Sequence, residues 1–192
     1  MDKLEQEIDV MPLEFTTSYL KDSLDVLRYY KLLAERAMAQ IPDEAFGITL
    51  DAESNSIATI VKHLAGNMRS RFTDFLASDG EKPDRNRDGE FEEPPGTRTE
   101  VMEVWENGWN CLFHALTPLT EEDLTRKILI RAEPHSVMQA INRQIAHYSY
   151  HIGQIVYLAK HFAGNEWRAV TVPRGKSAEF TARVARGEAS QR

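Results

Sequence analysis

The sequence predicts an all-α protein, a four-helix bundle with a long crossover loop between the second and third helices. Four long stretches place apolar residues at mixed steps of three and four, which is the period of an amphipathic helix. A polar stretch from about Asp79 to Arg98 separates the second of these stretches from the third. Because 192 residues are enough to bury a single sizeable core, we expect one domain, residues 1–192, with an irregular tail after about residue 165.

The first two helices are bounded by residues that favour helix ends. The first is expected from about Thr17 to Gln40, and Pro42 marks its end because proline cannot continue a helix. Ser56 is the expected N-cap of the second helix, which we place as far as about Ser78. The segment between the two helices is rich in turn-forming residues and is expected to be a connection.

The crossover loop, "SDGEKPDRNRDGEFEEPPGTRT", is rich in proline, glycine and charge. Loops of this length within one domain are usually functional or mobile. We expect this one to border the site; the alternative is that it is only a connection. Thr97 and Glu100 form a capping box that opens the third helix, which should end near Leu116. The segment "RKILIRAE" that follows is expected to be briefly extended.

The fourth helix also has clear end signals. Ser136 and Gln139 form a second capping box, and Gly164 is expected to end the helix at its C′ position. The tail beyond it is expected to be irregular, with one short helix after Ser177. Four amphipathic helices joined by one long crossover favour a helix bundle.

The overall composition narrows the classes of partner. A net charge of -7 disfavours nucleic acid as a partner, because nucleic-acid binding rewards a basic surface. The single cysteine, Cys111, cannot form an internal disulfide, which fits a reducing compartment. The acidic N-terminus lacks a signal-peptide core, and no apolar run is long enough to span a membrane. We therefore expect a soluble, cytoplasmic protein that binds neither nucleic acid nor membrane.

Two histidines in the fourth helix are the first candidates for a chemical role. His147 and His151 are four residues apart in "IAHYSYHIGQIVYLAKH", so their side chains lie on one face of a helix and could chelate one metal ion. The residues between them, 148–150, lack the glutamate of the zinc protease motif with this spacing, which disfavours a protease. The alternative is that both are interior polar residues satisfied by hydrogen bonds.

A third candidate ligand lies in the second helix. His63, in "IVKHLAGN", stands beside the apolar stripe, and in bundles metal sites are assembled from inward side chains of facing helices. Three histidines would leave coordination positions open for water or substrate; the alternative for His63 is a helix border in contact with solvent. Glu103 and Asp74 are candidates for supporting or fourth ligands, with solvated surface charge as the alternative. The remaining histidines are expected on the surface: His114, His135 and His161.

Three separated blocks resemble the DinB/YfiT-like superfamily of four-helix metalloproteins, and within it a bacterial branch of unassigned function. The blocks are "SIATIVKHLAGNMRSRFTDFLASDGEKPDRNRDGEFE", "AINRQIAHYSYHIGQIVYLAKH" and "VPRGKSAEF", and the similarity runs from about Phe15 to Phe180. The resemblance implies a divalent metal, zinc or nickel, held by His63, His147 and His151. It also implies a homodimer. Characterised relatives activate a low-molecular-weight thiol: bacillithiol S-transferases and the mycothiol-dependent maleylpyruvate isomerase.

Three functions are compatible with these residues. The first is transfer of a small-molecule thiol to an electrophile, with the metal lowering the pKa of the thiol. The thiol would come from outside, because Cys111 lies among Trp109, Leu112 and Phe113 and is expected to be a buried structural thiol. The second function is hydrolysis by a metal-activated water, which needs a base that the sequence does not place. The third is a non-catalytic metal-binding stress or interaction protein, which would need a fourth protein ligand.

An anionic thiol cofactor would also need hydrogen-bond donors. The candidates for cofactor binding are Arg69 and Arg71, which follow His63, and Tyr148, which adjoins His147. Further candidates are Arg85 and Arg87 in the crossover loop, and Tyr150. The alternatives are a solvated mixed-charge surface for the arginines and packing between helices for at least one tyrosine.

Overall fold

The computed structural model describes residues 13–190, which are mostly helical. This confirms the all-α class in its broad form. The helices are α1 (Tyr19–Met38), α2 (Ile57–Phe72), α3 (Arg98–Leu116), α4 (Val137–Ala163) and α5 (Ser177–Ala185), with a two-stranded sheet of β1 (Lys127–Ile130) and β2 (Glu133–Ser136). Short 3-10 turns are η1 (Asp43–Gly47), η2 (Asp88–Phe91), η3 (Glu121–Thr125) and η4 (Gly164–Glu166).

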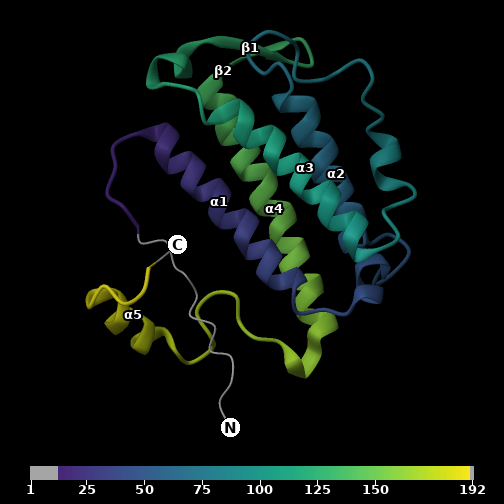
Figure 1. Cartoon of the computed structure of the whole chain (residues 1–192), viewed down its shortest axis with the longest axis vertical. Coiled ribbons are helices and arrows are strands. Elements are labelled where there is room, and N and C mark those ends of the chain that lie inside the picture. The colour runs from purple at the N-terminus through teal and green to yellow at the C-terminus, as the bar shows by residue number, and fades with distance from the viewer. Residues whose placement is uncertain (1–12, 191–192) are drawn as a thin grey trace.

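The four long helices lie side by side, and the hairpin of β1 and β2 lies across one end of them (Figure 1). Helix α2 packs against α3, α1 packs against α4, and α2 also contacts α4. The crossover loop, residues 73–97, follows α2 and runs along the outside of the helices before α3 begins, while α5 lies apart from them (Figure 1). The contact between α2 and α4 brings the segments that carry the predicted histidines together.

The predicted helix ends follow from capping chemistry. Three predicted N-caps are confirmed, because each side-chain oxygen accepts the amide hydrogen bond of the residue three positions on: Ser56, Thr97 and Ser136. Thr97 and Ser136 also form the reciprocal bonds of a capping box. Gly164 follows α4 with φ +53°, a conformation that glycine adopts at little cost. The sequence therefore predicted where α2, α3 and α4 begin.

The predicted end of α2 was wrong. The helix ends at Phe72 and not near Ser78, because Thr73 is extended and Asp74 is left-handed with φ +48°. Aspartate favours such turn conformations over the helix interior. A separate turn follows, in which the amides of Ala77 and Ser78 donate to the carbonyl of Asp74. Phe75 is still buried, which is why the apolar pattern continued past the true end of the helix.

The extended segment predicted at "RKILIRAE" is the first strand and the turn of a hairpin. Ile128 and Ile130 of β1 face the core alternately with exposed residues, which is the pattern of a half-buried strand. Arg131 and Ala132 form the turn with φ of +55° and +60°. The carboxylate of Asp79 accepts both of their amides, at 2.8 and 2.7 Å. The start of the crossover loop therefore fixes this turn.

One continuous apolar core joins the long helices and the hairpin. Its largest fully buried side chains include Trp105 and Trp109 of α3 and Tyr148 of α4. Burial of this area is the main source of the free energy that holds α2 and α4 at a fixed distance. In residues 13–190 no helix combines the length and the apolar character that a membrane span requires.

Candidate metal centre

Three histidines from two helices meet where α2 contacts α4. His63 of α2 is buried, 4% exposed, and faces His147 and His151 of α4, which are partly buried. The Nε2 atoms of His63 and His147 lie 3.3 Å apart, and one ring nitrogen from each of the three residues lies within 4.8 Å of the others. The structure thus brings together all three candidate ligands, and His63 is not at a solvent-exposed helix border.

Hydrogen bonds orient two of the three imidazoles. The Nδ1 atom of His63 lies 2.8 Å from a carboxylate oxygen of Glu90, and Nδ1 of His151 lies 2.7 Å from the amide oxygen of Gln154. Because both partners are acceptors, each Nδ1 carries the proton. In the neutral ring Nε2 then keeps its lone pair, and a hydrogen bond from the other ring nitrogen to an acceptor is the usual arrangement of a metal-ligating histidine.

The histidines of α4 are held in the neutral form. Burial lowers the pKa of His147 to about 3, and the nearby His151, His63 and Arg143 lower it in the same direction. Burial also lowers the pKa of His151, although the bond to Gln154 opposes this. Neutral imidazole is the form that binds a metal ion. His147 and His151 therefore present their nitrogen donors without a preceding deprotonation at neutral pH.

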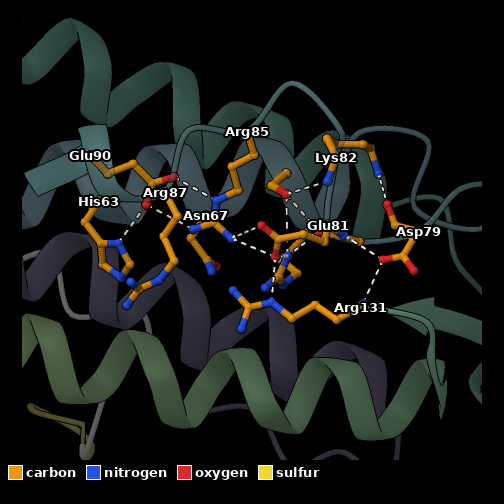
Figure 2. Close-up of polar contacts among 12 residues, drawn as sticks. His63, Asn67, Asp79, Glu81, Lys82, Arg85, Arg87, Glu90 and Arg131 are labelled. Atoms are coloured by element: carbon orange, nitrogen blue, oxygen red, sulfur yellow. Dashed lines mark hydrogen bonds and ion pairs between the residues drawn. The ribbon is translucent and has the colours of Figure 1, made fainter.

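Glu90 is a site residue that the sequence analysis missed. It lies in η2 of the crossover loop, 6% exposed, between His63 and Arg85 (Figure 2). Arg85 donates from Nε and Nη2 to the two oxygens of Glu90 at 2.8 and 3.0 Å. Burial opposes ionisation of Glu90, but the hydrogen bonds from His63 and Arg85 outweigh it and lower its pKa. Glu90 is therefore an ionised acceptor that holds the ring of His63 in place.

Helix α2 is shaped to receive η2. A Cβ atom at Gly66 would come within 2.5 Å of Oε1 of Glu90, so only glycine leaves room for this carboxylate. Lys62 donates to the backbone carbonyls of Gly89 and Glu93 at 2.7 and 3.1 Å. A glycine in the middle of a helix, one turn from His63, was the sequence feature that could have indicated a close contact here. Glu103 and Asp74, the carboxylates proposed from the sequence, are exposed and lie outside the histidine cluster.

The three histidines form part of the wall of a cavity of about 580 Å³, here called the histidine cavity. The ring of Phe91 stacks on His63 with 4.8 Å between centroids, and Tyr150, 64% exposed, stands at the rim. Among the described residues the lining contains no carboxylate. Its charged residues are five arginines: Arg71, Arg85, Arg87, Arg131 and Arg143.

The predicted cofactor-binding residues have different positions. Arg71 lines the histidine cavity, but it is 5% exposed and donates to the carbonyl of Gly80 and, at 3.0 Å, to Glu81. Burial lowers its pKa, and the pairing with Glu81 only partly opposes this. Arg69 is outside this cavity and lines another on the far side of Arg85. Of the two arginines predicted from α2, only Arg71 therefore faces the histidines.

The two candidate tyrosines also differ. Tyr148 is fully buried, and its hydroxyl donates to Oδ1 of Asn67 at 3.1 Å, so it packs between α2 and α4 and does not line the cavity. One residue in a helix corresponds to a rotation of about 100°, which turns Tyr148 into the core while His147 faces the cavity. Tyr150 does line the cavity. A cofactor in the histidine cavity could therefore contact Tyr150 directly but not Tyr148.

The single cysteine lies on the other side of the loop. Cys111 is partly buried and lines a second cavity of about 490 Å³, here called the cysteine cavity, together with Lys62, Arg69 and Asp84. Its Sγ lies 3.7 Å from Oγ1 of Thr73. Cys111 is more open than the buried structural thiol expected from the sequence, but it does not line the histidine cavity. The three remaining histidines also lie outside the histidine cluster: His114, His135 and His161.

Comparison with known proteins gives a family without an assigned activity. The family model described as "Protein of unknown function (DUF1572)" matches residues 14–176. This match covers most of the chain, and the chain belongs to that family. No curated protein matches the chain.

Proposed function

We propose that this member of the DUF1572 family is a DinB-like four-helix-bundle protein that binds one divalent transition metal ion, zinc or nickel, through His63, His147 and His151. The main support for this proposal is that one ring nitrogen from each of these three histidines, on two helices, lies within 4.8 Å of the other two. Metal–nitrogen bonds of about 2.0–2.1 Å in a tetrahedral set place neighbouring ligand atoms about 3.3–3.4 Å apart. His63 and His147 already have that separation, at 3.3 Å.

We propose further that the centre is catalytic and transfers a low-molecular-weight thiol to an electrophile. When bound, the ion would act as a Lewis acid that lowers the pKa of a thiol. The protein's own residues would set the geometry: Glu90 holds His63, Gln154 holds His151, and Phe91 covers the His63 ring. The thiol would be a separate molecule, because Cys111 lies outside the histidine cavity.

Two observations support this reaction over the alternatives. Hydrolysis by an activated water needs a general base, and no carboxylate is among the described residues that line the histidine cavity. A structural metal usually has four protein ligands, whereas the cluster in the described residues contains three. An open position beside a cavity without a carboxylate favours an external thiol, because a metal ion would lower the thiol pKa enough for the proton to pass to solvent without a protein base.

Cobalt substitution tests the thiol step. We expect bacillithiol, mycothiol, glutathione or cysteine to give the Co²⁺-loaded protein an intense sulfur-to-metal charge-transfer band in the near ultraviolet. The His151→Ala variant should lose the band. The matched control His161→Ala, an exposed histidine on the same helix, should keep it. If all four thiols leave the parent spectrum unchanged, thiol transfer is wrong and metal-dependent hydrolysis becomes the function to pursue.

A further inference from the structure

The arginines of the histidine cavity carry more positive charge than the carboxylates paired with them neutralise. Five arginines line it, although the whole chain has a net charge of -7. Three carboxylates pair with these arginines: Glu81, Glu90 and Asp88. The balance is five positive charges minus three negative charges, or +2, before any metal ion is counted. Like charges gathered in one wall repel one another, so this excess indicates a site built for an anion.

The arginines fall into two groups with different surroundings. The side chains of Arg71 and Arg85 are only 5% and 3% exposed and are engaged by Glu81 and Glu90, so they support the wall. The other three stand at the mouth: Arg87, Arg131 and Arg143. Figure 2 shows Arg87 extending beside His63, and Arg131 approaching Glu81 from the other side.

The three arginines at the mouth come from three separate segments of the chain. Arg87 belongs to the crossover loop, and its side chain is 51% exposed. Its guanidinium lies over the ring of Phe91, 5.3 Å from the centroid, and its one ion pair among the described residues is with the highly exposed Asp88, at 3.8 Å. Arg131 belongs to the hairpin turn, and its side chain is 55% exposed. Its Nε donates a hydrogen bond to a carboxylate oxygen of Glu81 at 3.0 Å. Arg143 belongs to α4, is exposed, and forms no ion pair with any described residue. All three line the same cavity, and guanidinium groups supplied by separate segments can bind one anionic group together.

The position of Arg131 is fixed at a conformational cost. Both residues of its turn are non-glycine residues in the left-handed region, and neither is an asparagine or aspartate that would favour it. Asp79 holds this turn through two backbone amides. Strained backbone of this kind is retained where the surrounding structure fixes it, often at ligand sites. The hairpin therefore presents Arg131 to the cavity as a fixed group.

A buried polar group in the same wall lacks a partner. Gln144 lies on α4 one turn before His147, is 2% exposed and lines the histidine cavity. Its Oε1 has no hydrogen-bond partner among the described residues. A buried amide without a partner is costly, and a ligand can remove that cost. Because this oxygen is an acceptor, Gln144 offers the cavity wall a position for a hydrogen-bond donor of a ligand, apart from the ligand's anionic group.

We infer that the histidine cavity binds a small molecule with a carboxylate or phosphate group, held at the mouth by Arg87, Arg131 and Arg143 while its other end reaches the three histidines. The volume of about 580 Å³ suits a low-molecular-weight compound. The inference deepens the proposed function, on which it rests for the reactive end. The anion site itself is made of the protein's own arginines and does not require the metal.

Calorimetric titration of the metal-free full-length protein tests the anion site, with the chelator removed by dialysis. Succinate and inorganic phosphate are the two probes, and the one that binds more tightly identifies the carboxylate or the phosphate class. We expect Arg143→Gln to weaken binding about tenfold, the effect of one charge-assisted hydrogen bond. The control Lys160→Gln removes the same charge from an exposed position about 26 Å further along α4 and should bind as the parent does.

Two results would overturn the inference: no heat of binding from either anion at millimolar concentration, or an equal loss in Arg143→Gln and Lys160→Gln, which would indicate a general charge effect. Circular dichroism of both variants should match the parent, since both residues are exposed. The outcome is separable from the thiol experiment. Anion binding without the cobalt–thiol band would contradict only the proposed reaction, whereas the band without anion binding would contradict only the arginine site.

Discussion

The histidine cavity and the cysteine cavity flank the same crossover loop, share Arg85 and have similar volumes of about 580 and 490 Å³, yet their chemistry differs. The histidine cavity has three imidazoles and positive charge that exceeds the charge of the paired carboxylates. The cysteine cavity mixes Lys62 and Arg69 with Asp84 and Glu90 around a partly buried thiol. Volume therefore does not distinguish a candidate site here. Two features distinguish the histidine cavity. Hydrogen bonds to Glu90 and Gln154 orient two of its imidazoles, and its arginines outnumber the carboxylates paired with them.

The periodicity of α2 explains how neighbouring residues serve the two cavities. His63, Asn67 and Arg71 recur every four residues and face the histidine cavity. Lys62, Gly66 and Arg69 face the cysteine cavity. Residues one or two positions apart point to different sides of a helix. For this reason proximity to His63 in the sequence did not place Arg69 beside the three histidines.

The largest effect should come from removing a ligand from the histidine cavity. We expect His151→Ala to abolish stoichiometric binding of zinc or nickel and to leave the helical circular dichroism largely intact, because the ring is only partly buried. Cys111→Ala, the equivalent change in the cysteine cavity, should leave the metal content at about one ion per chain. Elemental analysis of untagged protein measures both. Full metal content in His151→Ala would contradict the assignment of this ligand.

A smaller loss of affinity is expected when a ligand is retained but its support is removed. Glu90→Gln keeps the size of the side chain and removes the charge that holds His63 and Arg85. Loss of such a supporting group typically lowers metal affinity by about 10–100-fold. The control Asp84→Asn removes one carboxylate from the same loop on the cysteine-cavity side. Competition titration with a zinc chelator should separate the two variants, and equal affinities would show that Glu90 does not support the site.

Replacing two glycines, one in α2 and one in α4, tests whether α2 and η2 fit closely together. Gly66→Ala should displace Glu90, weaken zinc binding severalfold and lower the free energy of unfolding by about 1–3 kcal/mol, since the new Cβ has no space. Gly153→Ala lies in α4 with nothing within 4 Å. It should leave zinc affinity unchanged and raise the free energy of unfolding by up to about 1 kcal/mol. Urea unfolding and zinc titration measure both. Similar behaviour of the two variants would argue against a close fit between α2 and η2.

The smallest effect expected concerns pH. Because the pKa of His147 is lowered from its ordinary 6.5 to about 3 in the folded state, the unfolded chain binds more protons between those values. Stability from this group is complete above about pH 6.5 and is lost as the pH falls toward 3. The charged or titratable groups that face His147 are His63, His151, Arg71 and Arg143.

Urea midpoints of the metal-free protein should therefore fall from pH 7 to pH 5, and fall less in His147→Gln, which has no imidazole to protonate at that position. Circular dichroism at a fixed urea series provides the measurement. A parallel pH dependence in parent and variant would show that His147 is not held in the neutral form.

Local patterns predicted where three helices begin and which histidines share a face of α4. The capping residues Ser56, Thr97 and Ser136 fixed three helix starts, because capping depends on side chains a few residues away. The spacing of His147 and His151 fixed their common face. His63 needed one further assumption, that α2 faces α4, which the helical contacts bear out.

The rest of the site depends on contacts between segments that are distant in the sequence. Glu90 reaches His63 from a loop whose course no local pattern determines, and Arg131 depends on a turn held by Asp79, 52 positions away. The end of α2 was misplaced because Phe75 remained apolar and buried after the helix had stopped. In each case the deciding interaction is tertiary, and it overrides local propensity.

X-ray absorption at the zinc edge of the reconstituted protein tests the central claim most directly, namely that His63, His147 and His151 hold one ion with an open position. We predict three imidazole nitrogens at about 2.0–2.1 Å and one further light atom. Addition of a small thiol should replace that light atom with sulfur at about 2.3 Å. A spectrum with fewer than three imidazole nitrogens would contradict the account.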